Sequence, residues 1–307
     1  MKTRLSPDAS FSRRSFLSVS AAVTAAIATP ISISAAAEAA KNSEGPRKRT
    51  IGLELYSVRG ELGRDLPETL KTVAGFGYEI VEFYSPYFKW KPAYAKEVRA
   101  QMDDLGLRCY STHNGFDSFT PGENLAHTIE LNQILGTRYV ILASAPGRKG
   151  VDGWKGLCEK LAVAQKELEQ HGLGAGYHNH AGEWAKLENG QRIMEVIAAN
   201  TPNEFVLQLD VGTCEEAGAD PLAWVKANPG RIKVMHLKDW APGKKEDEKS
   251  YRVLFGEGVT PWKELLGTAE AVGGLEYFLI EQEGSRFSEF ETAQKCLENW
   301  KKMFAKG

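Results

Sequence analysis

The chain has 307 residues, of which 42% are hydrophobic and 25% charged, and its formal net charge at pH 7 is −2. This balance is typical of one large domain with a full hydrophobic core, and it excludes a dominant basic surface for nucleic acid. The four cysteines show no paired spacing, so we interpret them as small buried apolar residues and not as disulfides or a zinc site: Cys109, Cys158, Cys214 and Cys296.

The first forty residues differ in character from the rest of the chain. Residues 12–17 read Ser-Arg-Arg-Ser-Phe-Leu, a twin-arginine pattern, and a mildly apolar stretch follows over residues 16–33. An Ala-rich run at residues 35–40 is suited to signal cleavage. The segment resembles a bacterial twin-arginine export signal. We therefore expect residues 1–40 to be removed and the protein to be exported, to the periplasm.

A membrane anchor is the alternative interpretation of this segment. Its Ser and Thr content and Pro30 are poorly suited to a spanning helix, so we expect no stable membrane insertion after processing. Residues 41–49 are charged and are predicted to be a linker. Residues 50–307 are then predicted to form one domain.

From residue 51 onward, short apolar runs alternate with runs of helical spacing. The apolar runs predict eight strands, at residues 51–56, 79–84, 107–113, 138–143, 173–178, 205–210, 232–236 and 277–281. The runs of helical spacing predict eight helices, at residues 66–76, 94–105, 123–135, 154–171, 191–199, 221–227, 261–272 and 287–304. Asp65 is placed to cap the first of these helices and Gly77 to end it.

Eight successive βα units favour a single (β/α)8 TIM barrel, which is an α/β fold. The strands show no clean alternation, as expected of parallel strands that are buried on both faces. A doubly wound open sheet is the alternative. It is disfavoured because no Gly-x-Gly-x-x-Gly turn follows the first predicted strand.

Ionisable and aromatic side chains gather where the predicted strands end. Because the active site of such a barrel lies at the carboxyl ends of its strands, we expect these residues to converge: Glu54, Tyr56, Glu82, Tyr84, His113, His178, His180, Asp210, His236 and Glu281. Each alone could form an ion pair or cap a turn, but burying all of them without a function would be costly. Converging carboxylates and imidazoles require a cation, and this mixed set suits Mn, Zn, Co, Fe or, less well, Mg.

His178 and His180 lie two residues apart at the end of the fifth predicted strand. Side chains at this spacing on a strand point to the same face, so both imidazoles face one place. Such a pair is suited to binding a divalent metal. The alternative is one core histidine and one loop cap, and the residues alone leave open which of the two would be the ligand.

Five motifs together resemble the xylose isomerase-like TIM barrel superfamily and, within it, the sugar phosphate isomerase/epimerase branch. They are Tyr-His-Asn-His-Ala-Gly-Glu-Trp at 177–184, Leu-Asp-Val-Gly at 209–212, His-Leu-Lys-Asp at 236–239, Phe-Gly-Glu-Gly-Val at 255–259 and Leu-Ile-Glu-Gln at 279–282. Leu-Tyr-Ser-Val-Arg at 55–59 also fits that branch. The order and spacing of these motifs cover the whole predicted domain.

The resemblance implies one divalent metal held on strands five to eight, usually by a Glu, an Asp, a His and a Glu. Asp210, His236 and Glu281 match three of these positions. His178 stands where many members have glutamate, which makes the site less anionic and leaves the metal identity open. It also removes one of the two glutamates that act as acid and base in ketose epimerases, so His180 or Lys238 would have to supply a proton-transfer role.

We therefore expect a divalent-metal-dependent isomerase or epimerase that acts on a sugar or keto-sugar by abstracting a proton next to a carbonyl. His180 is the first candidate for the base, Lys238 would stabilise negative charge, and Glu281 is a further catalytic candidate. Substrate contacts are expected from four further residues at the strand ends: Glu54, Tyr56, Glu82 and His113.

Other function classes remain alternatives. The same site would act as a lyase if the enolate expelled a neighbouring group, as from an oxidised glycoside. A multi-zinc endonuclease would need a basic face and more ligands than six histidines comfortably supply. A non-catalytic sugar-binding protein also fits, because a fold does not fix a function. The expected partner is a small sugar, without a phosphate because of the export signal, and a homo-oligomer is left open.

Overall fold

The computed structural model describes residues 49–145, 147–243 and 250–304. The predicted signal peptide, and the predicted linker except Arg49, lie outside these residues. In the part of the chain that the structure describes, no helix is both long enough and apolar enough to cross a membrane.

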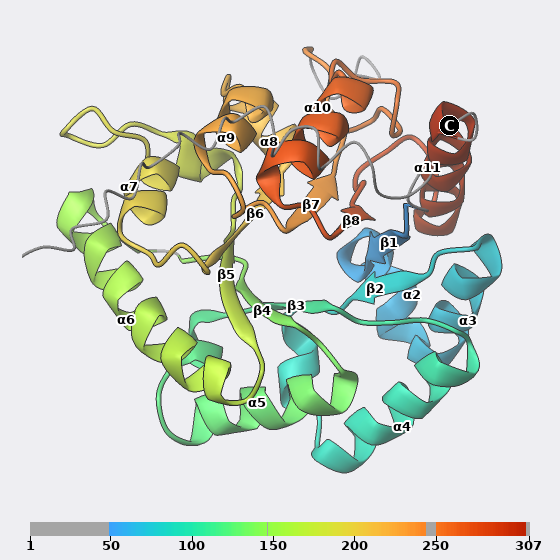
Figure 1. The fold of residues 1–307 in the computed structure, drawn as a ribbon. Helices are drawn as coiled ribbons and strands as arrows, with labels where there is room; N and C mark the ends of the chain where they lie inside the picture. The colour runs from blue at the N-terminus through green and yellow to red at the C-terminus, as the bar shows by residue number, and fades with distance from the viewer. Residues whose placement is uncertain (1–48, 146, 244–249, 305–307) are drawn as a thin grey trace, which may run out of the picture. The chain divides into compact units, whose positions relative to one another are not determined.

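Eight parallel strands form one sheet in the order β2-β1-β8-β7-β6-β5-β4-β3. They are β1 Ile51–Glu54, β2 Ile80–Glu82, β3 Ser111–Asn114, β4 Tyr139–Leu142, β5 Gly174–His178, β6 Val206–Asp210, β7 Val234–Leu237 and β8 Tyr277–Ile280. The two ends of this order, β2 and β3, meet through the parallel bridges Ile80–Arg108 and Phe83–Thr112. The sheet is therefore a nearly closed barrel with helices outside it (Figure 1), and the predicted (β/α)8 fold is confirmed.

All eight predicted helices are present. They are α3 Leu66–Phe76, α4 Pro92–Asp104, α5 Glu123–Leu135, α6 Gly150–Gln170, α7 Ile193–Ala199, α9 Pro221–Ala227, α10 Trp262–Thr268 with a π-helical extension at Ala269–Gly273, and α11 Glu289–Phe304. As predicted, the Asp65 carboxylate accepts a hydrogen bond from Glu68 N–H at 3.0 Å, and Gly77 ends α3 with a φ of 101°. Local capping chemistry thus sets the bounds of α3.

The structure adds short helices that the sequence pattern did not predict. They are η1 Leu55–Val58, α2 Arg59–Arg64, η2 Ser85–Lys89, η3 Phe116–Phe119, η4 Ala181–Trp184 and α8 Val211–Glu216. Each is too short to develop a repeating apolar face. All of them follow the carboxyl end of a strand, so they shape the loops on the side of the barrel where the candidate site lies.

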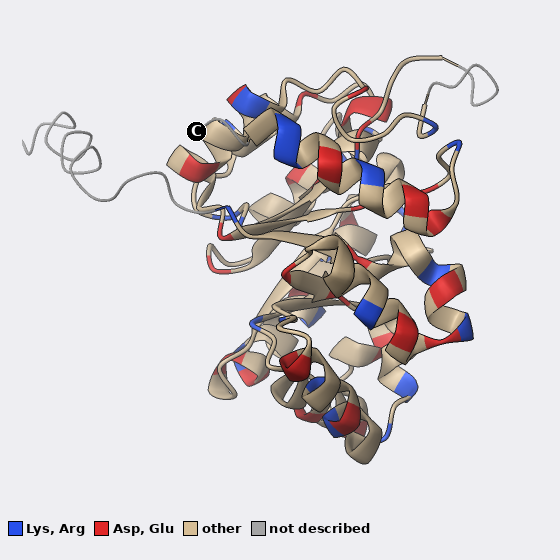
Figure 2. Ribbon diagram, turned by 90° about the vertical axis from the view of Figure 1, so that its right-hand side faces the viewer, with Lys and Arg blue, Asp and Glu red and all other residues tan. Residues whose placement is uncertain are grey.

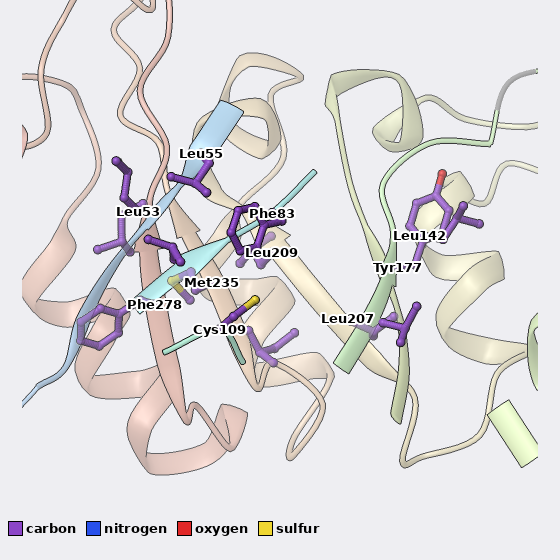
Figure 3. Close-up of a cluster of buried hydrophobic side chains, with 14 of the residues drawn as sticks. Leu53, Leu55, Phe83, Cys109, Leu142, Tyr177, Leu207, Leu209, Met235 and Phe278 are labelled. Carbon is purple, nitrogen blue, oxygen red and sulfur yellow. The ribbon is translucent and has the colours of Figure 1, made fainter. Parts of the chain in front are cut away.

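The main hydrophobic core lies between the strands and the surrounding helices. Strand residues whose side chains point outward from the barrel form the side of this core that faces the sheet, among them Leu53, Leu142, Leu207 and Phe278. The side chains labelled in Figure 3 belong to this core. The four cysteines are buried and form no disulfide, as predicted.

A second, smaller apolar cluster fills the barrel interior. It consists of Ile80, Ile141, Val206, Val234, Tyr277 and Leu279. Glycines make room for it. A Cβ on Gly176 would lie 2.5 Å from Ile141 Cδ1 and 2.9 Å from Val206 Cβ, closer than van der Waals contact allows. This apolar layer closes the barrel beneath the polar strand ends.

Charged residues of both signs alternate along the outer helices. On the face in Figure 2, Lys and Arg lie among Asp and Glu, without a large region of one sign. This face therefore does not resemble a nucleic-acid-binding surface.

Candidate active site and metal centre

The ionisable residues predicted at the strand ends come together in one buried cluster. Its members are at most 6% exposed: Glu54, Glu82, His113, His178, Asp210, His236, Lys238 and Glu281. Strand register makes some of them neighbours, because Glu54 pairs with Glu82 across β1 and β2, and Asp210 pairs with His236 across β6 and β7.

His236 lies between two glutamates. Its Nδ1 is 2.8 Å from Glu281 Oε2, and its Nε2 is 2.7 Å from Glu82 Oε2. Burial disfavours a charged ring, but the two carboxylates outweigh this effect and raise the pKa of His236 to about 10. A cation that binds one of these nitrogens must therefore displace a proton.

Gln208, two residues before Asp210 on β6, connects two histidines to Glu82. Its Oε1 accepts from His113 Nε2 at 2.6 Å and from His178 Nδ1 at 2.9 Å, and its Nε2 donates to Glu82 Oε1 at 3.0 Å. Burial, and then the neighbouring histidines, lower the pKa of His178 well below its usual value. His178 is thus neutral with its proton on Nδ1, which leaves the Nε2 lone pair free. Nε2 lies 3.9 Å from Asp210 Oδ2.

Lys238 is a buried cation among three carboxylates. Its Nζ lies 3.3 Å from Asp210 Oδ2, 3.3 Å from Glu281 Oε1 and 3.1 Å from Glu283 Oε1. Burial alone would lower the pKa of Lys238, but the carboxylates raise it well above its usual value. Lys238 is therefore a fixed positive charge beside the strand ends.

Glu54 and Glu82 are neighbouring carboxyl groups whose pKa values are shifted in opposite directions. Burial, and then the neighbouring Glu82, raise the pKa of Glu54 well above its usual value. Burial acts in the same direction on Glu82, but His113 and His236 outweigh it and lower the pKa of Glu82 to about 2. Of the two, Glu54 is therefore the one that favours the protonated form, and Glu82 the one that favours the charged form.

The four residues predicted as metal ligands fit a divalent metal. His178, Asp210, His236 and Glu281 each offer an atom within 4.8 Å of the others. Asp210 Oδ2 is buried and accepts no hydrogen bond from any described residue, since its contact with Lys238 is an ion pair without hydrogen-bond geometry. A buried oxygen of this kind is costly unless a cation satisfies it. The two imidazoles and two carboxylates suit zinc or a transition metal.

Two neighbouring triplets also bring ligand-type atoms together. They are His113 with His178 and His236, and Glu54 with Glu82 and His236. Both triplets include His236. Because each nitrogen of that ring can hold only one cation, the two triplets compete for a cation bound through the same nitrogen.

His180 and Tyr56 lie outside the buried cluster. The His180 ring is exposed and packs edge-on against the His178 ring at 4.9 Å, while its backbone N–H donates to Glu183 Oε2 at 3.0 Å. Tyr56 is 38% exposed and packs edge-on against Tyr84 at 5.3 Å. Both residues are therefore accessible to a ligand that approaches the strand ends.

Three members of the site were missed by the sequence analysis: Ser111, Gln208 and Glu283. Ser111 Oγ donates a hydrogen bond to Glu82, and Gln208 and Glu283 make the contacts described above. Each lies two positions from a predicted site residue. The two-residue period of a strand could therefore have found Ser111 and Gln208 on the same strand faces.

The Gly-Glu-Gly segment at 256–258, within the Phe-Gly-Glu-Gly-Val motif, forms an anchored loop. The Asp239 carboxylate accepts from the backbone N–H groups of Gly256 at 2.7 Å, Gly258 at 3.1 Å and Trp240 at 3.0 Å, and from Trp262 Nε1 at 3.0 Å. These backbone donors are already paired with an internal carboxylate. This glycine loop therefore offers them to Asp239 and not to a phosphate group.

The sequence model of the xylose isomerase-like TIM barrel family matches residues 70–303. The chain belongs to this family. An Escherichia coli (strain K12) protein, provisionally named as an L-ribulose-5-phosphate 3-epimerase, is 25% identical over 252 residues, which cover 72% of this chain and 85% of that protein. This match spans most of both proteins.

Two further relatives show the range of the family. The inosose dehydratase of Mesomycoplasma hyopneumoniae (strain 7448) is 33% identical over 108 residues, which are 34% of this chain and 35% of the dehydratase. A solved sugar phosphate isomerase/epimerase from Parabacteroides distasonis ATCC 8503 superposes with a TM-score of 0.68 at 24% identity, covering 83% of this chain and 94% of that one. At this identity the superposition shows a shared fold.

Proposed function

We propose that this protein is a divalent-metal-dependent isomerase or epimerase that acts on a sugar or keto-sugar by moving a proton next to a carbonyl. The observation that carries the proposal is the convergence of four buried ligand-type side chains from β5 to β8. The sugar epimerase and isomerase names among its relatives support the enzyme class. When bound, the metal would polarise the substrate carbonyl and so make the adjacent carbon-bound hydrogen more acidic.

Three residues of the chain are candidates for the remaining catalytic roles. His180 is our candidate for the base, because its ring is exposed, lies against the proposed ligand His178, and carries a nitrogen that can accept a proton. Lys238 would stabilise negative charge that develops on the substrate oxygens. Glu281 contacts both Lys238 and His236 and is a further candidate for proton transfer.

Glu54, Glu82 and His113 are candidates for binding and orienting substrate hydroxyl groups. The raised pKa of Glu54 favours the form that donates a hydrogen bond to an oxygen, whereas the lowered pKa of Glu82 favours the form that only accepts. Tyr56 lies at the exposed edge, where it could contact the outer part of a substrate. A carboxylic acid beside a carboxylate suits a polyol, which offers both donors and acceptors.

The charge of the site favours a substrate without phosphate. Asp210, Glu82, Glu281 and Glu283 bring more negative charge than Lys238 and the His236 imidazolium balance. Such a surplus attracts a divalent cation, and the site with that cation has no net positive charge left to hold a phosphate group. The Gly-Glu-Gly backbone donors are also already paired with Asp239. A neutral sugar or an oxidised glycoside fits these features.

The metal assignment is tested on purified protein. Elemental analysis should find one divalent metal per chain, and His236→Ala should lose it. Stoichiometric metal in that variant, or no metal under any loading condition, would overturn the assignment. The identity of the metal, among Mn, Zn, Co, Fe and Mg, comes from the same measurement.

The base is tested by exchange of the carbon-bound proton with deuterium. On a panel of keto-sugars, His180→Gln should keep the metal and the fold but lose exchange of the substrate proton with D2O. If His180→Gln loses the metal and His178→Gln keeps it, the two roles are reversed. Full exchange in His180→Gln would move the base to Glu281 or Lys238.

A lyase is the second candidate, because inosose dehydratases are among the relatives. The first step would be the same proton abstraction, after which a neighbouring hydroxyl or glycosidic oxygen leaves with the electron pair. Product analysis separates the two: an isomerase conserves the mass of the substrate, and a lyase releases water or an alcohol. A sugar-binding protein without catalysis would show binding but no exchange.

We also propose that the protein works outside the cytoplasm, in the periplasm. The support is the twin arginine at residues 13–14, the apolar run and the Ala-rich end of the first forty residues. Replacing Arg13 and Arg14 by Lys should trap an unprocessed precursor inside the cell. Normal processing of that variant would exclude the twin-arginine route.

A further inference from the structure

A pocket of about 440 Å³ beside the candidate site has no role in the proposed reaction. This volume is in the usual range for small-molecule sites. One wall is the junction of α2 and α3, and the other is the segment after β2, which contributes Phe83, Tyr84, Tyr87, Trp90 and Tyr94. The wall formed by this segment is therefore largely aromatic.

These rings form a rigid surface. Trp90 packs edge-on against Phe83 at 5.1 Å, Tyr87 at 6.0 Å and Tyr94 at 5.4 Å. The Tyr87 hydroxyl is buried and accepts from Asn132 Nδ2 at 2.9 Å, which fixes that ring from behind. A surface fixed in this way loses little conformational entropy when a ring packs on it.

The pocket also has free polar groups at its edge. Among the residues that the structure describes, the hydroxyls of Tyr84 and Tyr94 and the indole N–H of Trp90 have no hydrogen-bond partner. Tyr94 is 38% exposed, and Trp90 and Tyr84 are half-buried. Apolar ring faces flanked by free donors match a ring that has C–H groups on its face and oxygen atoms at its edge.

The pocket adjoins the candidate site at Tyr84. Tyr84 lines the pocket, and its extended backbone follows Glu82 by two residues. Their Cα atoms are then separated by about 7 Å, roughly the length of one sugar ring. Tyr84 also packs against Tyr56, which lies at the exposed edge of the site.

We propose that this aromatic pocket binds the second ring of a glycoside, while the first ring lies over Glu54 and Glu82. The inference rests on the proposed function and narrows its substrate class from a free sugar to a glycoside. The second ring is either another pyranose or an aromatic aglycone, since both present a flat face of C–H groups or π electrons.

The test is calorimetric titration of the full-length, metal-loaded protein with six glycosides. They are the methyl, phenyl and glucosyl β-D-glucopyranosides and the three corresponding β-D-galactopyranosides. Phenyl or glucosyl glycosides should bind about tenfold more tightly than the matching methyl glycoside, the size of one well-placed ring contact. Trp90→Ala and the milder Tyr94→Ser should remove this difference and leave the affinity for the methyl glycoside unchanged. Tighter phenyl binding identifies an aromatic aglycone, and tighter glucosyl binding a second sugar.

Phe88→Ala is the matched control, because Phe88 lies two residues before Trp90 but packs on His127 and does not line the pocket. It should keep the preference for the second ring. Equal affinities within every pair, or a preference that survives both Trp90→Ala and Tyr94→Ser, would overturn the proposal. If the glycosides bind but the protein holds no metal and shows no turnover, the proposed reaction is contradicted and the binding pocket is not. The two failures are therefore distinguishable.

Discussion

Glu82 would act on the candidate metal site through His236 and not as a ligand. Its Oε2 lies 2.7 Å from His236 Nε2, while His236 Nδ1 faces the other candidate ligand, Glu281. A carboxylate on the far nitrogen of a ligating histidine fixes the orientation and tautomer of the ring. If a metal binds at His178, Asp210, His236 and Glu281, this contact leaves Nδ1 as the His236 nitrogen that would hold it and makes Glu82 a positioning residue.

We predict that Glu82→Gln weakens the binding of the divalent metal by roughly 10- to 100-fold, the usual effect of losing such a partner. Titration of metal-free protein with Zn²⁺ or Mn²⁺ measures this change. Glu283→Gln is the control, because Glu283 contacts Lys238 and no histidine ligand, and it should have a smaller effect. Unchanged affinity in Glu82→Gln would mean that this contact does not orient the ligand.

Glu215 makes the stability of the folded protein depend on pH. Burial is the main cause that raises its pKa from 4.5 to about 7, Asp239 and Asp210 add to this effect, and the hydrogen bond from Thr260 opposes it. Because the folded-state pKa is raised, folding favours the protonated form. The resulting stability is complete below about pH 4.5 and is lost as the pH rises through about 7.

We therefore predict that Glu215→Gln, compared with the parent, is more stable at pH 8 but equally stable at pH 4.5. The gain at pH 8 is about 1–2 kcal/mol after allowance for the partial exposure of Glu215. Urea unfolding of metal-free protein at the two pH values measures it. A stability difference that is the same at both pH values would assign the effect to packing and not to charge.

The residues that carry charge were predictable, whereas the contacts that orient them were not. Asp210 and His236 end apolar runs, where an ionisable side chain stands out in the sequence. Gln208 lies inside such a run, and its role depends on which histidines the barrel places opposite it. That arrangement is set by strand register, which a single sequence does not specify.

At the scale of elements, helix bounds were predicted best where capping residues set them, as Asp65 and Gly77 do for α3. The third strand was predicted at 107–113 but forms at Ser111–Asn114. In the residues before it, Arg108 makes only an isolated bridge to Ile80. Strand formation there depends on a distant pairing partner and not on the local apolar pattern.

At Gly176 in β5, the packing inside the barrel leaves no room for a side chain. We predict that Gly176→Ala destabilises the fold by about 1–3 kcal/mol through overpacking. Its Cβ would collide with Ile141 and Val206 inside the barrel. Gly156→Ala in α6 is the matched control, because nothing lies within 4 Å of its added Cβ, and it should gain up to about 1 kcal/mol. Thermal unfolding compares them, and a tolerated Gly176→Ala would show that the interior layer can shift.

At the scale of the whole molecule, the eight βα units of the sequence were sufficient to predict the barrel. They were not sufficient to predict how it closes. Seven strand pairs form continuous ladders, whereas β2 and β3 meet through two bridges. The candidate metal ligands all come from β5 to β8, on the opposite side of this closure in the strand order. A bound metal would therefore link four consecutive strands.

This arrangement predicts that metal removal destabilises the entire barrel. A ligand that binds only the folded state stabilises it by about 2.7 kcal/mol at one hundred times its dissociation constant. For a domain of this size that corresponds to a rise in the melting temperature of roughly 5–10 °C. Scanning calorimetry with and without a chelator measures this difference. His236→Ala should show no metal-dependent rise, because it lacks one of the four ligands.

His127→Ala separates this effect from unspecific binding to histidine. His127 bonds the backbone oxygen of Phe88 from α5, away from the cluster, so its loss should leave the metal-dependent rise intact. Metal that bound mainly to unfolded chains would lower the melting temperature of every variant. Equal melting of the chelated and loaded parent protein, or a full rise in His236→Ala, would contradict a metal that stabilises the folded barrel through β5 to β8.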